Sequence, residues 1–309
     1  MDLPVEHLAT FAAIVEEGSF EGAARRLHVT PSAISQRVRA LEQRVGSVLL
    51  QRSRPVEVTE AGATVLRVAR QLERLVGDAE HELGGVSGGA AIPIVVNADS
   101  LATWFVPALA RAARETGALF EVIRADETMS TERLRRGDAM AALTATRDPV
   151  PGCTSTRLGA HRYRAVASPS FAAAHFGGAP SGSGSPSADL SSGVGVTAEA
   201  LRSAPMMEFD RHDAFQQRFL RRVSRSSIDP PRHYVPSSTE FARAIELGMG
   251  WGMLPEGQCA EPLADGRLVE LVAGSPIDLP MYWQRWKLAS PVLDRLSEIV
   301  AEEAAAALA

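Results

Sequence analysis

Apolar positions recur at helical spacing in the segments that precede residue 90. Residues 4–17 predict a helix that Gly18 ends, and "EGAARRLH" predicts a second, shorter helix. A third helix follows a tight connection, with Thr30 as its hydroxyl N-cap and Pro31 at its first position. Three short helices with a tight turn between the last two predict a helix-turn-helix.

The third helix has two contrasting faces. At about 100° per residue, its apolar residues form a stripe about 60° wide: Ile34, Val38, Leu41 and Val45. The opposite side presents hydroxyls, amides and one arginine: Ser32, Ser35, Gln36, Arg39 and Gln43. Solvated helix faces usually mix Glu with Lys, whereas hydroxyls, amides and arginine are the groups that reach base edges and phosphates. The pattern favours a surface that contacts DNA.

Two short β-prone runs follow in "VLLQRSRPVEV", with Arg52 and Arg54 at the turn between them. They predict a wing that lies over the phosphate backbone or an adjacent minor groove. A long helix from about Thr59 to Gly84 then repeats apolar residues at three- and four-residue steps: Val65, Val68, Leu72, Leu75 and Ala79. Such a seam predicts pairing with the same helix of a second subunit, and "GGVSGG" predicts a flexible joint at 84–89.

Beyond residue 90, short apolar strands alternate with helices, which predicts parallel sheet and two α/β lobes around a cleft. The expected fold class is therefore α+β and α/β. The expected domains are a winged helix-turn-helix (1–58), a linker helix and hinge (59–89) and an effector domain (90–309). Within the effector domain, lobe I is expected over about 90–161 and 268–309, and lobe II over about 162–267. The Gly/Ser/Pro tract at 177–193 predicts a disordered surface loop.

Charge and composition narrow the class of protein. The net charge of −5 argues against a chain that binds nucleic acid over its whole surface. The segment from Ser19 to Val56 is nevertheless basic, because it contains seven arginines and only two glutamates. The chain contains no apolar run long enough to cross a bilayer, and its start lacks a secretion signal, so we expect a cytoplasmic protein. Cys153 and Cys259 lack metal or redox spacing, and two buried thiols are the expected outcome.

The segment "GSFEGAARRLHVTPSAISQRVRALEQRVGSVLLQRSRPVEVTEAG" closely resembles the N-terminal domain of LysR-type transcriptional regulators. Further strings, "NADSLATWFVPAL", "YRAVASPSF", "HYVPSSTEFARAIELGMGWGMLP" and "MYWQRW", resemble the ArgP/LysG subgroup. The tract at 177–193 departs from the short glycine turn expected there, which puts the local surface in doubt.

The resemblance implies a winged helix-turn-helix on a dimerising helix, and an effector domain similar to periplasmic binding proteins. It also implies a homodimer or homotetramer that binds an interrupted palindromic operator in double-stranded DNA and controls an amino-acid exporter gene. The implied effector is L-lysine or L-arginine, with no cofactor, no metal and no membrane partner, and contact with RNA polymerase is left open. The implied groove contacts are Thr30, Pro31, Ser32, Ser35, Gln36 and Arg39, and the implied wing contacts are Arg52 and Arg54.

An effector with two cationic groups requires carboxylates, because a buried unpaired charge is costly. We predict three, each at or just after a strand end: Asp99, Glu127 and Asp210. Backbone N–H groups around Ser100 to Thr103 are expected to hold the α-carboxylate. Neutral donors and acceptors are expected from Thr128, Thr144, Ser168, Ser238 and Thr239. Trp104 either packs on the ligand's methylene chain or belongs to the core.

Three other classes of protein are compatible with an α/β chain of this length: an enzyme, a solute-binding protein and an architectural DNA-binding protein. The sequence contains no GxSxG nucleophile elbow between a strand and a helix, no P-loop or HExxH, no GxGxxG after a strand and no clustered Cys/His ligands. No catalytic residue is therefore expected, and the chain is not predicted to be an enzyme. A solute-binding protein is disfavoured by the missing signal peptide and the arginine-lined helix. An architectural or replication-origin DNA-binding protein that ignores small molecules stays open, because the same DNA-contacting face would serve it.

Overall fold

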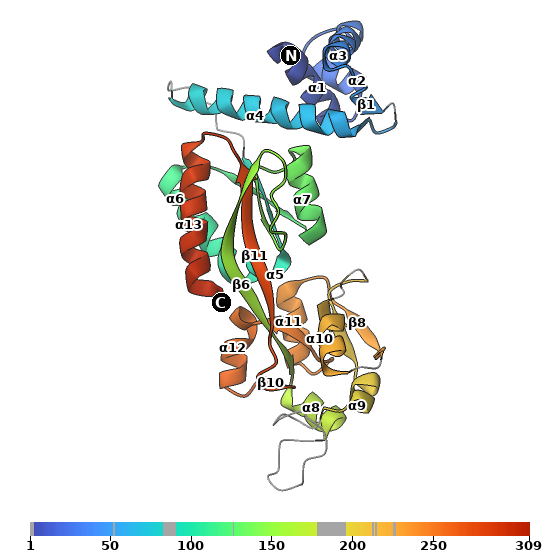
Figure 1. Ribbon diagram of the computed structural model, residues 1–309, viewed down its shortest axis with the longest axis vertical. Helices are drawn as coiled ribbons and strands as arrows, with labels where there is room; N and C mark the ends of the chain where they lie inside the picture. Colours follow the sequence, from blue (N-terminus) through green and yellow to red (C-terminus); the bar gives the residue numbers. More distant parts are fainter. Residues whose placement is uncertain are drawn as a thin grey trace. The chain divides into compact units, whose positions relative to one another are not determined.

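The computed structural model describes residues 3–51, 53–82, 91–125, 127–177, 196–211, 213, 215–224 and 227–309. The chain forms two compact units, each assembled from segments that are distant in the sequence (Figure 1). Unit 1 comprises Met1–Asn97, Leu109–Thr156 and Tyr282–Ile299, and unit 2 comprises Ala98–Ala108, Arg157–Met281 and Val300–Ala309. Neither unit is therefore a continuous stretch of the chain.

Unit 1 begins with three helices: α1 (Val5–Glu17), α2 (Phe20–Arg26) and α3 (Pro31–Val45). Hydroxyl caps start the second and third helices, since Ser19 accepts a hydrogen bond from the Gly22 N–H at 3.0 Å and Thr30 accepts one from the Ala33 N–H at 3.2 Å. Gly18 ends α1 with a left-handed φ of 63°. The fully buried residues that the three helices share are Phe11, Ile14, Ala23, Ile34 and Leu41.

A two-stranded antiparallel ribbon and a long helix follow: β1 (Leu50–Gln51), β2 (Glu57–Val58) and α4 (Glu60–Glu82). The first half of α4 packs into the helix-turn-helix core through Leu66, which is 1% exposed. A Cβ at Gly62 would lie 2.0 Å from the Leu49 carbonyl oxygen, so the approach of α4 to that backbone requires glycine. The second half differs, because Leu75 and Val76 are 41% and 46% exposed.

The rest of unit 1 is built on a sheet ordered β11-β5-β3-β4, from β3 (Ile92–Val96), β4 (Phe120–Arg124), β5 (Ala141–Thr144) and β11 (Ile277–Trp286). Strand β3 is parallel to β4 and β5, and β11 is antiparallel to β5. Figure 1 shows α6 (Val106–Thr116) and α13 (Pro291–Ala307) on one side of this sheet and α7 (Glu127–Arg136) on the other. Val95 and Leu143 are fully buried, as a sheet covered on both faces requires.

Unit 2 is built around β6 (Cys153–Ala167), which pairs antiparallel with β9 (Gly252–Pro255) and β10 (Val269–Glu270). A second pair, β7 (Met206–Glu208) and β8 (Arg232–Tyr234), is parallel. Around these strands lie α5 (Ala98–Ser100), a π-helical turn (Leu101–Phe105), α8 (Pro169–Phe176), α9 (Ala198–Ser203), α10 (Phe215–Val223), α11 (Ser238–Glu246) and α12 (Glu256–Ala264). Buried residues that pack together here include Val166, Met207, Ile245, Leu254 and Cys259.

The sequence pattern predicts the three N-terminal helices, the ribbon and α4 individually, and beyond residue 90 it predicts only that strands alternate with helices. Helix α8 has the same start signal as α3, with Ser168 as its cap and Pro169 at its first position. Residues Leu101–Phe105 form a π-helical turn between α5 and α6. The predicted joint at 84–89 and residues 178–193 of the Gly/Ser/Pro tract lie outside the described residues. No described helix is long and apolar enough to cross a membrane.

Candidate functional sites

The first candidate surface is the polar face of α3. Ile34 and Leu41 are fully buried and Val38 is 4% exposed, which confirms the predicted inward stripe. On the other side Thr30, Pro31, Ser32, Gln36, Arg39 and Gln43 are exposed, and Ser35 is half-buried. The helix therefore presents its hydroxyl, amide and guanidinium groups to solvent.

Hydrogen bonds organise the start of this face. The Thr30 hydroxyl, besides capping α3, lies 2.9 Å from the Ser32 hydroxyl, and Ser35 donates to the Pro31 carbonyl oxygen at 3.0 Å. The neighbouring arginine on the helix, Arg37, has a different role, because it donates to Thr10 of α1 at 3.2 Å. The three hydroxyls are thus held in fixed positions on the first turn.

The wing adds basic charge beside this domain. Arg54 is exposed in the connection between β1 and β2, as predicted, while Arg52 lies outside the described residues. The Ser53 hydroxyl donates to the Pro55 carbonyl oxygen at 2.7 Å and so tightens the connection. A compact, basic turn of this kind suits contact with phosphates.

The second candidate site centres on Asp99 in α5. Its two carboxylate oxygens each accept a hydrogen bond of 2.6 Å, one from the Tyr163 hydroxyl on β6 and one from the Ser238 hydroxyl at the start of α11. The Gln258 side-chain N–H of α12 donates to the Ser238 oxygen at 3.0 Å. Thr103 donates to the Asp99 carbonyl oxygen at 2.7 Å. We call these five residues the Asp99 cluster.

A buried histidine lies behind this cluster. The His161 Nε2 atom is 2.8 Å from the Ser100 hydroxyl and accepts a hydrogen bond from the Trp104 indole N–H at 3.3 Å. Because an indole nitrogen only donates, Nε2 is unprotonated and the imidazole is neutral with its proton on Nδ1. Burial lowers the pKa of His161, and the nearby negative charge of Asp99 only partly opposes this shift.

Two predicted contact residues, Ser100 and Trp104, lie against this histidine. Ser100 is fully buried and Trp104 is 5% exposed, with its ring 5.3 Å from that of Phe105. The π-helical turn brings the consecutive residues Trp104 and Phe105 both into the interior, and such turns are frequent at functional sites. Trp104 therefore belongs to the core that supports Asp99.

The remaining predicted effector contacts have local partners. Ser168 caps α8 by accepting the Phe171 N–H at 3.3 Å, and Asp210 accepts the Asp213 N–H at 3.0 Å in an exposed turn. Thr144, in unit 1, is fully buried, and Thr239 is exposed on α11. The side chains of Glu127 and Thr128 lie outside the described residues. Of the predicted set, the structure gathers Asp99, Thr103 and Ser238, with Ser100 and Trp104 behind them.

Three residues of this site escaped the sequence reasoning: His161, Tyr163 and Gln258. An aromatic residue in a strand is ordinarily a packing residue, and the seven histidines of the chain form no cluster in the sequence. A usable signal was present, because His161 and Tyr163 are two positions apart on a strand and so share one face. Gln258 lies three residues after the end of β9, and the ends of strands are where ligands of α/β sheets tend to bind.

The two cysteines have no place in either site. Burial raises the pKa of Cys153 to about 11 and that of Cys259 to about 12, so both are protonated, unreactive thiols at neutral pH. Among the described residues, no three His, Cys, Asp or Glu side chains are arranged to hold a metal ion.

Comparisons with known proteins agree with this arrangement. Residues 5–63 match the model of the bacterial regulatory helix-turn-helix protein, lysR family, and residues 92–305 match the LysR substrate binding domain. The HTH-type transcriptional regulator LysG of Mycobacterium tuberculosis is 42% identical over 295 residues, which are 95% of this chain and 91% of that protein. The lysine export transcriptional regulatory protein LysG of Corynebacterium glutamicum is 38% identical over 299 residues, 96% of each chain.

A solved structure extends the similarity to the whole fold. Full-length LysG of Corynebacterium glutamicum with bound effector Arg superposes with a TM-score of 0.82 and 36% identity, covering 99% of both chains. The predicted combination of a helix-turn-helix and a LysR effector domain is therefore confirmed, as is the expectation of a regulator, since these relatives are transcriptional regulators. The chain belongs to the LysR family of bacterial helix-turn-helix regulatory proteins.

Proposed function

We propose that this regulator senses a basic amino acid, L-lysine or L-arginine, at the Asp99 cluster and controls transcription of an amino-acid exporter gene. The observation that supports a ligand with a cationic group is the Asp99 carboxylate, which two hydroxyl donors hold in one orientation. A cationic ligand needs such a partner, because an unpaired charge taken out of water is costly. The similar LysG of Corynebacterium glutamicum is a lysine export regulator and has been solved with bound Arg.

The DNA-binding function is assigned to α3 and the wing. We propose that Thr30, Pro31, Ser32, Ser35, Gln36 and Arg39 enter a major groove, while Arg52 and Arg54 contact the backbone or a minor groove. Five of the six α3 residues are exposed, and the hydroxyls on the first turn are fixed by hydrogen bonds. Hydroxyl, amide and guanidinium groups supply the donors and acceptors that base edges and phosphates require.

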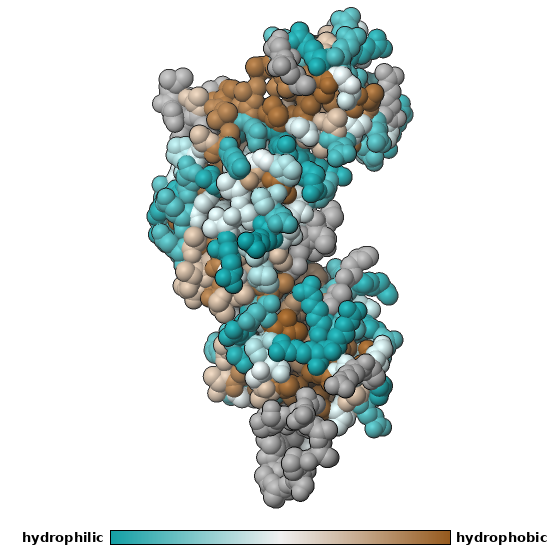
Figure 2. Space-filling model, viewed as in Figure 1, coloured by the Kyte–Doolittle hydropathy of each residue, from teal (hydrophilic) through white to brown (hydrophobic). Residues whose placement is uncertain are grey.

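A second copy of the chain is the proposed partner of α4. Hydrophobic residues gather along this helix on the face shown in Figure 2, and Val68, Leu75 and Val76 are among its exposed residues. Val65 and Leu72 of the predicted seam instead pack against their own helix-turn-helix core, so Val68 and Leu75 are the large hydrophobic residues that the seam offers to a second copy. Pairing of two α4 helices would place two α3 helices on half-sites about 34 Å apart, as an interrupted palindrome requires. A tetramer would pair two such dimers.

One experiment tests both halves of the proposal. We expect the full-length protein to shift DNA from upstream of its own gene, with a position or affinity that changes when L-lysine or L-arginine is added. L-norleucine is the matched control, because it has the shape of lysine without the side-chain ammonium group. A shift that ignores both basic amino acids would favour an architectural or replication-origin role, and no salt-sensitive shift at all would contradict the assignment of α3.

A further inference from the structure

Gln258 differs from the other members of the Asp99 cluster because its hydrogen bonding is incomplete. Its N–H group donates to Ser238, but its Oε1 atom is buried and has no hydrogen-bond partner among the described residues. A buried acceptor without a donor is destabilising, so it calls for an explanation, and here the neighbouring Asp99 carboxylate points to a missing cationic partner. The oxygen lies two hydrogen bonds from the Asp99 carboxylate, through the Ser238 hydroxyl.

The direction of the hydrogen bonds fixes which Gln258 atom is left over. The Ser238 hydroxyl donates its single proton to Asp99, so its oxygen can only accept from Gln258. Gln258 must therefore turn its N–H toward Ser238, and its carbonyl oxygen is left for another donor. A bound molecule with an N–H or O–H group would complete the cluster.

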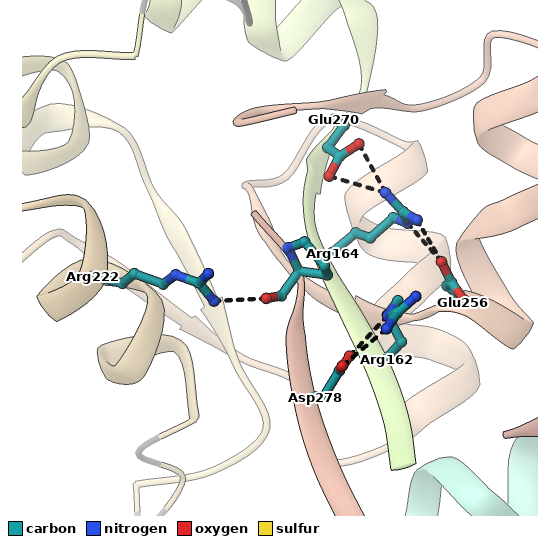
Figure 3. A network of polar contacts seen from close by, with 7 residues as sticks. Arg162, Arg164, Arg222, Glu256, Glu270 and Asp278 are labelled. Atoms are coloured by element: carbon teal, nitrogen blue, oxygen red, sulfur yellow. Dashed lines mark hydrogen bonds and ion pairs between the residues drawn. The ribbon is translucent and has the colours of Figure 1, made fainter. Parts of the chain in front are cut away.

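The start of α12 is held firmly enough to place this oxygen. Figure 3 shows the Arg164 guanidinium between Glu256 and Glu270, with contacts of 2.5 Å and 3.1 Å. Glu256 is the first residue of α12 and Arg164 follows Tyr163 on β6, so the Arg164–Glu256 ion pair joins the two elements that supply Gln258 and Tyr163. Glu270, on β10, holds the same guanidinium from a third element. Gly257 brings the helix close to the π-helical turn, since a Cβ there would lie 3.0 Å from Thr103.

The Asp99 cluster favours an ammonium group over a guanidinium group. Each carboxylate oxygen already accepts one hydroxyl hydrogen bond, which leaves fewer lone pairs for a guanidinium, whose usual contact with a carboxylate takes two parallel hydrogen bonds. An ammonium needs only one free lone pair on Asp99 and has further N–H donors for Gln258. Among the two proposed effectors, the primary ammonium group that lysine and arginine share is the α-ammonium.

We propose that Gln258 is a specificity-determining residue that accepts a hydrogen bond from the α-ammonium group of the bound amino acid, while Asp99 neutralises its charge. The inference rests on the proposed function, because it takes lysine and arginine as the ligands. If this assignment is correct, other groups of the protein bind the side-chain cation of the ligand. A free α-amine is then required for binding.

Calorimetry on the full-length protein tests this assignment. We expect Gln258→Met, which keeps the length of the side chain but removes its polar atoms, to weaken L-arginine and L-lysine by the same factor, about tenfold. We expect Nα-acetyl-L-arginine to bind the unaltered protein at least about a hundredfold more weakly than L-arginine, because acetylation removes the positive charge and leaves only one of the three N–H donors. The acetylated ligand tests the site without any risk to folding.

The matched control is Glu261→Gln on the same helix, where the side chain is 88% exposed and affinity is expected to stay unchanged. Circular dichroism and effector-free DNA binding are expected to be the same for all variants. Three results would overturn this inference and leave the proposed function standing. They are unchanged affinity in Gln258→Met, a loss of affinity for only one of the two amino acids, and full affinity for Nα-acetyl-L-arginine. If the unaltered protein binds neither amino acid, the proposed function fails together with it.

Discussion

The polar face of α3 lies within one helix, whereas the hydrogen bond between Asp99 and Ser238 joins residues 139 positions apart. The side chains of this polar face are largely exposed to water, and their arrangement follows from helical periodicity. The Asp99 cluster combines α5, the π-helical turn, β6, α11 and α12, and much of it is shielded from water. The difference teaches that a solvated recognition surface tolerates loss of a single group, while a shielded cluster depends on each member.

The largest effect on effector affinity is expected from a substitution of Asp99, the charged residue of the cluster. Asp99→Asn removes the carboxylate with little change in shape, and we expect a loss of about 2–3 kcal/mol in effector binding, because the cation of the ligand is left without a charged partner. Effector-free operator binding should be unaffected, since α3 lies in unit 1 and Asp99 in unit 2. Calorimetry with L-lysine and L-arginine, beside a mobility shift, measures both. Equal affinity in the variant would remove Asp99 from the site.

The second prediction concerns the buried His161, whose protonation makes the stability of the folded protein depend on pH. The pKa of His161 is lowered in the folded protein, so below the ordinary histidine value of about 6.5 the unfolded chain binds a proton that the folded chain does not. We expect the free energy of unfolding to fall with acidification, by at most about 1.4 kcal/mol per pH unit from this group. Urea unfolding at several pH values, compared with His161→Gln, isolates the contribution. The variant should show a shallower pH dependence, and identical curves would contradict the assignment.

The smallest expected effect is on the exposed face. Arg39→Ala should weaken operator binding about fivefold, or about 1 kcal/mol, because one solvated contact is lost. If Arg39 contacts only phosphate, the loss is the same for every DNA sequence and the salt slope decreases by about one. Mobility shifts over a range of salt concentrations measure both quantities. A loss confined to one base position would instead identify Arg39 as a base-reading residue.

Local signals predicted the elements far better than the site. Thr30 followed by Pro31, and Gly18 after an apolar helix, mark helix ends through short-range sterics and hydrogen bonding, and the structure confirms both. Asp99 and Ser238 were predicted because both stand near strand ends, but nothing local separates them from Ser168 or Asp210, which have capping roles. Tyr163 and His161 were overlooked because a strand aromatic is ordinarily a packing residue.

By itself, the sequence determined the helix-turn-helix, the inward stripe of α3 and the alternation of strands and helices beyond residue 90. These features depend on neighbours within a few positions, so periodicity and capping specify them. Only the tertiary structure decided which polar residues surround Asp99, that His161 is neutral, and that the Gln258 oxygen is left without a donor among the described residues. Those outcomes depend on burial and on the direction of hydrogen bonds between distant segments, and a linear pattern contains neither.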